Sequence, residues 1–298
     1  MAVFNFGSIN IDYVYKVDHF VAPGETLSST AYKAILGGKG ANQSIACAKA
    51  GTRTLHIGAI NSKDQHMLSP MTEAGVDMSH VKHSDDIASG HALIQVTPDA
   101  ENAIILFGGA NHTIELDHID EVLQQAQTND WVLLQNETNA ISDIINKAYA
   151  KHIPVAFNPA PMTADIASLP LEKIQLLIVN EIEAMQLTNT KTENEAKLVL
   201  QQQYPNTNIL LTLGKNGVIY LHAGNEQRAE AFVVDAKDTT AAGDTFIGYF
   251  LANYTNQDNV ESAMRIACAA SAIAVTREGA APSIPDKDEV STFLSNRT

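Results

Sequence analysis

Residues 131–157, WVLLQNETNAISDIINKAYAKHIPVAF, contain two short apolar runs, at 131–134 and 155–157, with a longer segment of helical character between them. Similar runs lie before and after this stretch, at residues 3–6, 55–60, 176–179 and 209–213. Short apolar runs that alternate with helices are typical of a mainly parallel sheet covered on both faces. We therefore predict a three-layer α/β fold around a doubly wound, mainly parallel sheet.

Two segments depart from this alternation, residues 13–34 and 91–107, which have strand character without intervening helices. They predict a small antiparallel sheet that projects from the main sheet as a lid, or else an edge extension without a functional role. The run at 217–221 follows 209–213 after only three residues, which indicates an antiparallel hairpin. Because the sequence has no internal repeat, low-complexity tract or Pro/Ser-rich linker, we expect residues 1–298 to form one domain that carries the lid.

The composition of the chain argues against several classes of protein. With 298 residues, of which 45% are hydrophobic, the chain is long enough for a large core. The formal net charge of -15 should repel a phosphate backbone, which argues against general nucleic-acid binding. The two cysteines, Cys47 and Cys268, lack the spacing of a metal site or disulfide framework and should be buried thiols. Without a signal-peptide pattern or an apolar stretch of about 20 residues, we expect a cytoplasmic protein with no membrane partner.

The string Asp238-Thr239-Thr240-Ala241-Ala242-Gly243-Asp244-Thr245-Phe246 leads into a helix predicted at residues 242–253. Small residues at a helix start leave backbone N–H groups uncovered, and these donors together with the helix dipole form a site for phosphate. Asp244 could act as a catalytic group there, or could simply cap the helix. Capping requires neither the glycine nor the two alanines, which favours the catalytic interpretation.

A second glycine cluster, Gly37-Gly38-Lys39-Gly40-Ala41-Asn42-Gln43, also leads into a helix, predicted at residues 44–50. It is not a Walker A loop, because Gly40 stands where that motif needs Ser or Thr, and the chain has no G-x-G-x-x-G dinucleotide fingerprint. Glycines that bring the backbone close to a ligand, with Lys39 and Asn42 as donors, would suit a polyhydroxylated molecule. A tight turn is an equally good explanation of the cluster alone.

Further strings accompany these two along the chain. They are Gly7-Ser8-Ile9-Asn10-Ile11-Asp12, Pro23-Gly24-Glu25-Thr26, Gly108-Gly109-Ala110-Asn111, Asn158-Pro159-Ala160-Pro161, Asn180-Glu181-x-Glu183, Thr212-Leu213-Gly214 and Thr276-Arg277-x-Gly279-Ala280-x-Pro282-Ser283. Through all of these motifs, in family order over residues 7–285, the chain resembles the ribokinase (PfkB) family of carbohydrate kinases. The resemblance implies a kinase that uses ATP to phosphorylate a sugar.

By this resemblance, Asp244 takes the proton from the primary hydroxyl of the sugar, and the N–H groups around Ala241, Ala242 and Gly243 hold the transferred phosphoryl group. Sugar recognition falls to Asn10, Asp12, Gly38, Lys39, Asn42 and Glu137. Asn10 seen alone would be an ordinary turn residue, but within the family an asparagine there suits ribose better than 2-deoxyribose. The implied reaction is phosphorylation of the 5-hydroxyl of D-ribose. Another furanose, 2-deoxyribose or a nucleoside, is the alternative substrate, and a non-catalytic sugar or nucleotide sensor is the remote alternative.

The resemblance also implies ATP, Mg²⁺ and a potassium ion as ligands. The ATP contacts are Asn180, Thr212, Gly214, Gly217 and Cys268, and the cation residues are Glu183 for Mg²⁺ and Asp238, Thr240, Val275, Glu278, Ala280 and Ser283 for potassium. Two departures adjoin the site: Val179 stands where the family often has proline, and Asn136 where an apolar residue is common. By analogy with the family, we expect a homodimer that forms through the lid.

Overall fold

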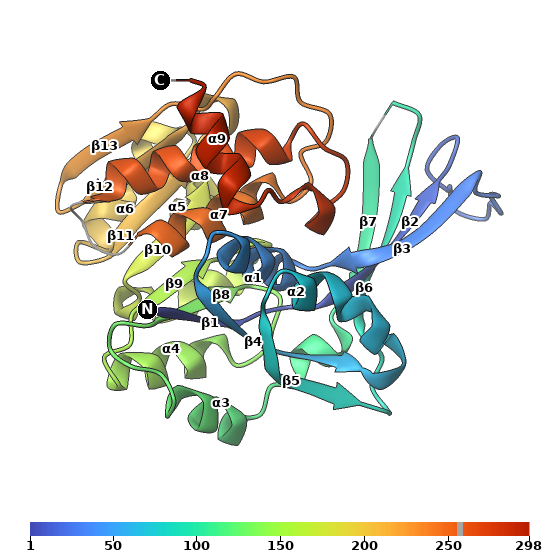
Figure 1. The fold of residues 1–298 in the computed structure, drawn as a ribbon, viewed down its shortest axis with the longest axis horizontal. Helices are drawn as coiled ribbons and strands as arrows, with labels where there is room; N and C mark the ends of the chain where they lie inside the picture. Colours follow the sequence, from blue (N-terminus) through green and yellow to red (C-terminus); the bar gives the residue numbers. More distant parts are fainter. Residues whose placement is uncertain (100, 255–258, 298) are drawn as a thin grey trace.

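A nine-stranded sheet runs through the molecule in the order β13-β12-β11-β10-β9-β8-β1-β4-β5 (Figure 1). The computed structural model describes residues 1–99, 101–254 and 259–297. Strands β11 to β5 along this order are parallel, whereas β12 and β13 are added antiparallel at one edge. The strands are β1 (Ala2–Phe6), β4 (Arg53–Asn61), β5 (Asp77–Ser84), β8 (Trp131–Gln135), β9 (Val155–Asn158), β10 (Leu176–Asn180), β11 (Asn208–Thr212), β12 (Val218–His222) and β13 (Asn225–Ala229).

Helices cover both faces of this sheet. One face carries α1 (Lys39–Lys49), α2 (Ser69–Glu73), α7 (Ala242–Asn253), α8 (Val260–Ala274) and α9 (Lys287–Ser295). The other carries α3 (Leu116–Leu123), α4 (Ile141–Ala150), α5 (Glu181–Thr188) and α6 (Glu193–Gln203). Adjacent residues of β1, Val3 and Phe4, pack into the two opposite cores, as the two-residue period of a strand requires. The prediction of a three-layer α/β fold is confirmed.

The predicted apolar runs all became strands of this sheet, but two strands were missed. Strands β5 and β13 lie at the two edges, and β13 has the mostly polar sequence NEQRA with mostly exposed side chains. An edge strand needs no continuous apolar run, so the sequence pattern that predicts the central strands is absent from β5 and β13. Helix α1 begins at Lys39, five residues before the predicted start at residue 44, because the glycine cluster forms its first turn.

A separate four-stranded sheet projects from the main body as the predicted lid (Figure 1). Its order is β3-β2-β6-β7, with β2 (Asn10–Lys16), β3 (Ala31–Gly37), β6 (Gly90–Val96) and β7 (Asn102–Phe107). The prediction of antiparallel pairing is right for β2–β3 and β6–β7 and wrong for the central pair β2–β6, which is parallel. The first strands of two hairpins that both leave the body must run in the same direction when they meet. Treating the chain as one domain with a lid stays a prediction.

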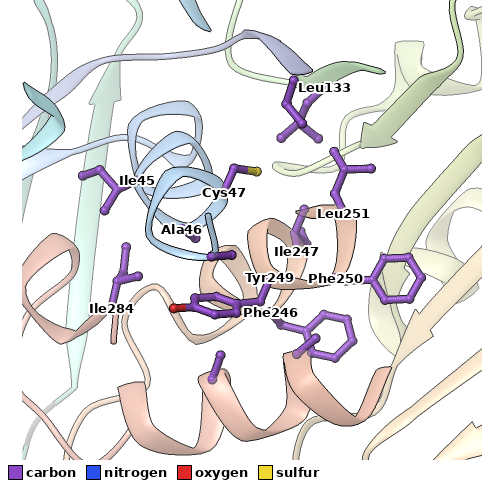
Figure 2. Close-up of a cluster of buried hydrophobic side chains, with 14 of the residues drawn as sticks. Ile45, Ala46, Cys47, Leu133, Phe246, Ile247, Tyr249, Phe250, Leu251 and Ile284 are labelled. Atoms are coloured by element: carbon purple, nitrogen blue, oxygen red, sulfur yellow. The ribbon is translucent and has the colours of Figure 1, made fainter. Parts of the chain in front are cut away.

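Helices α1 and α7 lie in direct contact, and Figure 2 shows their side chains in one apolar cluster. A Cβ at Gly248 would lie 2.4 Å from the Cβ of Ala46 and 2.8 Å from the backbone nitrogen of Cys47. The missing side chain therefore lets the two backbones approach closely. The helices run in the same direction, since Asn42 contacts Asp244 and Cys47 contacts Gly248. Their first turns consequently meet at the same edge of the sheet.

No helix in the described ranges combines the length and the apolar character that are needed to cross a membrane.

We predict that Gly248→Ala lowers the free energy of unfolding, by about 1–3 kcal/mol, because the added methyl group overlaps Ala46. Urea-induced unfolding followed by circular dichroism measures the change. Helix propensity alone would stabilise the variant by about 1 kcal/mol. A gain in stability would thus contradict the close packing of α1 against α7.

Candidate active site

The candidate site lies at the carboxyl edge of the parallel strands. Strand β1 is flanked by β4 on one side and β8 on the other, so the chain winds outward from it in both directions. In open α/β sheets such a reversal leaves a crevice at the carboxyl ends of the strands, where ligands bind. Ser8 follows β1 and Glu137 follows β8, and the hydroxyl of Ser8 donates a hydrogen bond to the Glu137 carboxylate. Glu137 thereby sits at the point of reversal.

Asp244 lies in the first turn of α7, and its carboxylate is held from α1. Asn42 Nδ2 donates to Asp244 Oδ2 over 3.0 Å, and Gln43 Nε2 donates to Asp244 Oδ1 over 2.9 Å. Ala241 precedes the helix in the left-handed conformation, with φ of 58°. A Cβ at Gly243 would meet no atom within 4 Å, so open space adjoins the first turn. The N–H groups of a first turn have no acceptor within their helix, which makes this open start a suitable place for an anion, although the N–H of Ala242 donates to Thr239 O over 3.2 Å.

Four carboxylates surround the ammonium group of Lys39. The pKa of Lys39 is raised, first by Asp244 and further by Glu137, Glu183 and Asp12, although burial opposes the shift. Burial raises the pKa of Glu137 even though Ser8 and the backbone N–H of Lys39 donate to it. Burial, and then the charge of Glu137, raise the pKa of Asp12 to about 6. These predicted residues therefore share one polar, partly desolvated space.

Asn10 is the first residue of the lid strand β2, and its amide is oriented by Asn111. The Asn111 Nδ2 group donates to Asn10 Oδ1 over 2.7 Å, and Asn111 Oδ1 accepts from the backbone N–H of Ile9 at 2.9 Å. Gly38 packs beside Asn10 with φ of 92°, and a Cβ there would lie 2.9 Å from the Asn10 nitrogen. Asn111 was not among the predicted site residues, although it ends the quoted Gly108–Asn111 string.

The predicted nucleotide residues gather at the carboxyl ends of β10 and β11. Asn180 and Thr212 end these two strands and are paired in register. Asn180 and Glu183 bind each other in a capping box at the start of α5, with hydrogen bonds of 2.8 and 3.0 Å. A Cβ at Gly214 would meet nothing within 4 Å, whereas one at Gly217 would lie 2.1 Å from the oxygen of Ala229. The turn after β11 is thus open at its first glycine and tightly packed at its second.

Cys268 lies elsewhere, in the apolar core beside α7. It belongs to helix α8 and is 6% exposed, and burial raises the pKa of its thiol to about 12. Its placement agrees with the expectation of a buried thiol. The role of Cys268 as an ATP contact stays a prediction.

The residues predicted to bind potassium form two loops that Asp238 joins. Asp238 Oδ1 accepts from the N–H of Thr240 and Oδ2 from the N–H of Gly279, each at 2.8 Å. Burial opposes ionisation, but these donors outweigh it and lower the pKa of Asp238. The carbonyls of Val275 and Ala280 also lie in the loops, where they accept from Lys237 N–H and from Ser283. Glu278 is exposed on the second loop. Within the described part of the chain, no three His, Cys, Asp or Glu side chains form a metal-binding group.

An all-oxygen set of this kind fits a hard monovalent cation better than a transition metal. Near the nucleotide residues, Glu183 is the one predicted carboxylate, and burial raises its pKa. A single carboxylate fits Mg²⁺ that keeps most of its waters, since this ion rarely has an all-protein cage.

Comparison with known proteins identifies the class that this fold and site define. Residues 2–287 match the pfkB family carbohydrate kinases, so the chain belongs to this family. The chain is 35% identical to a ribokinase of Haemophilus influenzae over 97% of both proteins. It is also 29% identical to a deoxyribokinase of Salmonella typhi, again over 97% of both. The structure of Arabidopsis thaliana ribokinase complexed with ribose and ATP superposes with a TM-score of 0.88 at 28% identity, over 99% of each chain.

The raised pKa of Asp12 indicates that its buried negative charge destabilises the folded protein at neutral pH. The folded protein holds this proton more tightly than the unfolded chain, so the free energy of unfolding falls as the pH rises from about 4 to about 6. With a discount for partial exposure, Asp12→Asn should stabilise the protein by about 1–2 kcal/mol at pH 7.5 and lose this advantage below pH 4.

Denaturant unfolding at several pH values measures the effect of Asp12→Asn. Asp18→Asn, at an exposed aspartate of the neighbouring loop, serves as the matched control and should change little. Equal stabilities of Asp12→Asn and the wild type at pH 7.5 would refute a costly buried charge at this position.

Proposed function

We propose that the protein transfers the γ-phosphoryl group of ATP to the 5-hydroxyl of D-ribose. The observation that carries this proposal is the position of the Asp244 carboxylate, which lies at the open start of α7 and faces the same polar space as Lys39, Glu137 and Asp12. Membership of the family and full-length similarity to ribokinases support it. So does the likeness to a structure that is described as containing ribose and ATP.

In this proposal Asp244 accepts the proton of the sugar hydroxyl as its oxygen attacks phosphorus. The amides of Ala242 and Gly243, with Ala241 preceding them, stabilise the charge that develops on the transferred group. Mg²⁺, when bound, would neutralise charge on the β- and γ-phosphates. Asn180 and Glu183 would orient its water shell, and Thr212, Gly214 and Gly217 would line the nucleotide.

The choice of ribose rests on the orientation of Asn10. Because Asn111 occupies Asn10 Oδ1, the Nδ2 group of Asn10 is left to donate to a ligand. A donor at this point suits a hydroxyl oxygen that 2-deoxyribose lacks. The similarity to a deoxyribokinase keeps 2-deoxyribose or a nucleoside as the alternative substrate. A non-catalytic sensor is the remote alternative, against which the presence of both Gly243 and Asp244 argues.

We further propose that the lid joins two copies of the chain. It exposes a group of large apolar side chains, Tyr32, Leu93, Ile104, Ile105, Leu106 and Phe107, of which Ile105 is 67% exposed. Because these apolar side chains of the lid are exposed to water, burying them against another surface would be favourable. A second lid, which is the same surface, would meet it in a twofold arrangement.

The base assignment predicts that Asp244→Asn lowers kcat by about 10²–10⁴-fold, because the hydroxyl proton loses its acceptor, while the sugar still binds. A coupled ADP-release assay over ribose, 2-deoxyribose and nucleosides measures turnover and ranks the substrates. Asp117→Asn is the matched control, an exposed aspartate in the first turn of α3, and should keep full activity. Undiminished turnover by Asp244→Asn would rule out its role as base.

The loops around Asp238 predict activation by potassium, because the one that contains Asp238 and Thr240 leads directly into the first turn of α7 and Asp238 joins the other to it. Replacing potassium by sodium or a bulky organic cation at constant ionic strength should lower kcat about tenfold, a loss of about 1.4 kcal/mol of transition-state stabilisation. Steady-state rates measured in each salt test this. Equal rates in all salts would remove potassium from the proposal.

A further inference from the structure

A row of polar side chains lies buried beneath the candidate site, between α1 and the sheet. Its five members have no exposed surface: Asn5, Gln43, Ser44, His56 and Gln135. They come from three neighbouring strands, β1, β4 and β8, and from α1. Buried polar groups cost free energy unless they are hydrogen-bonded, so their partners define the arrangement.

The direction of the hydrogen bonds is set at the His56 end. His56 Nε2 lies 3.0 Å from the carbonyl oxygen of Gly7, which can only accept, so Nε2 carries the proton. Burial lowers the pKa of His56 to about 4, and the ring is therefore neutral with an unprotonated Nδ1. Ser44 Oγ donates to this Nδ1 over 2.8 Å and in turn accepts from Asn5 Nδ2 over 2.8 Å.

The row of hydrogen bonds extends to Asp244 through the NH₂ group of Gln135, which donates both to Asn5 and to Gln43. Asn5 Oδ1 accepts from Gln135 Nε2 at 3.0 Å, and the same Gln135 group donates to Gln43 Oε1 over 2.8 Å. With its oxygen engaged, Gln43 turns its NH₂ group toward Asp244 Oδ1 at 2.9 Å and Asn158 Oδ1 at 3.3 Å. A reversed Gln43 amide would put its oxygen against the carboxylate. The carbonyl of Gly7 thus fixes, through this chain, a donor beneath Asp244.

We propose that Gln43 is a positioning residue that holds the Asp244 carboxylate in its reactive orientation, and that Gln135 in turn orients Gln43. This inference deepens the proposed function and rests on Asp244 as the base. Asn42 holds one carboxylate oxygen and Gln43 the other, so the plane of the carboxylate is fixed from two sides. Gln43 has no exposed surface, so in this proposal it affects a ligand through Asp244 and not by direct contact. A donor to the carboxylate also favours its ionised form, which is the form that takes up a proton.

Other charges face Asp244 from the surrounding elements. Lys39 of α1 attracts it, while Glu137 after β8 and Glu183 of α5 repel it, and Asp12 of β2 adds to the negative charge around Lys39. All four groups remain when Gln43 is replaced. A change in pH dependence on replacement therefore reports the lost donor.

The test is Gln43→Met, which has nearly the same volume and no donor. We expect kcat to fall about 10–100-fold, since a misplaced reacting group costs about that much, while KM for ribose changes less than threefold. The acidic limb of the pH profile of kcat/KM should move to higher pH, because the ionised carboxylate has lost a hydrogen bond. Ile45→Val, in the buried face of the same helix, is the matched control and should affect stability alone.

Gln135→Met is the second variant, and it tests the positioning role of Gln43 if Gln43→Met does not fold. It leaves Gln43 in place but frees its amide to rotate, so the same shifts are expected with smaller size. Carbon-13 NMR titration of the Asp244 carboxyl, assigned by its absence in Asp244→Asn, gives the protonation midpoint without any need for turnover. The midpoint should rise in both glutamine variants.

The outcomes separate the two proposals. Unchanged kcat, pH profile and NMR midpoint in the folded glutamine variants, with turnover lost in Asp244→Asn, would overturn the positioning role alone. Full turnover in Asp244→Asn would overturn the base assignment and the positioning role with it. A lower kcat in Gln43→Met with an unshifted midpoint and pH profile would show a merely structural effect, which also overturns the inference.

Discussion

The close contact between α1 and α7 is the constraint on which the site depends. Gly248 admits Ala46, and the parallel course of the two helices brings their first turns to one edge of the sheet. Asn42 and Asp244 are 202 residues apart in the chain, yet their side chains are joined by a hydrogen bond of 3.0 Å. A small increase in the distance between the helices would separate the carboxylate from both of its donors.

Two local features of the site, Lys39 and the start of α7, oppose the negative charge of the whole molecule. The net charge of -15 would repel an anion at long range, but the open start of α7 and Lys39 supply local positive potential. The surrounding carboxylates Asp12 and Glu137 have raised pKa values because they are buried near one another. These buried carboxylates destabilise the ligand-free protein. Hydroxyl groups of a ligand that donate hydrogen bonds to them would offset this destabilisation.

The sequence predicted the centre of the fold better than its edges, for a physical reason. Strands that are covered on both faces, such as β8 and β9, are apolar at most of their positions, so they stand out in the sequence. Strand β13 has one neighbour and mostly exposed side chains, and its polar sequence gave no signal. The parallel pairing of β2 with β6 depends on how two hairpins leave the body. No local pattern encodes that relation.

The site was predictable where it is built from strings of adjacent residues and not where it is built across strands. The glycine cluster indicated Lys39 and Asn42, but Gln43 at its end received no role. Its partner on β8, Gln135, is 92 residues away and donates in turn to Asn5 of β1. Both Gln135 and Asn5 occupy buried strand positions where apolar residues would be expected.

A buried chain of amides is a costly way to fill a core, because each member must find partners in a fixed direction. Gln135 Oε1 has no hydrogen-bond partner among the described residues, so part of that cost is uncompensated. Apolar side chains could fill the same space between α1 and the sheet without this penalty. They would also leave Asp244 Oδ1 without the hydrogen-bond donor that Gln43 supplies. A requirement of the site for this one hydrogen bond would explain why the whole row of buried amides is present.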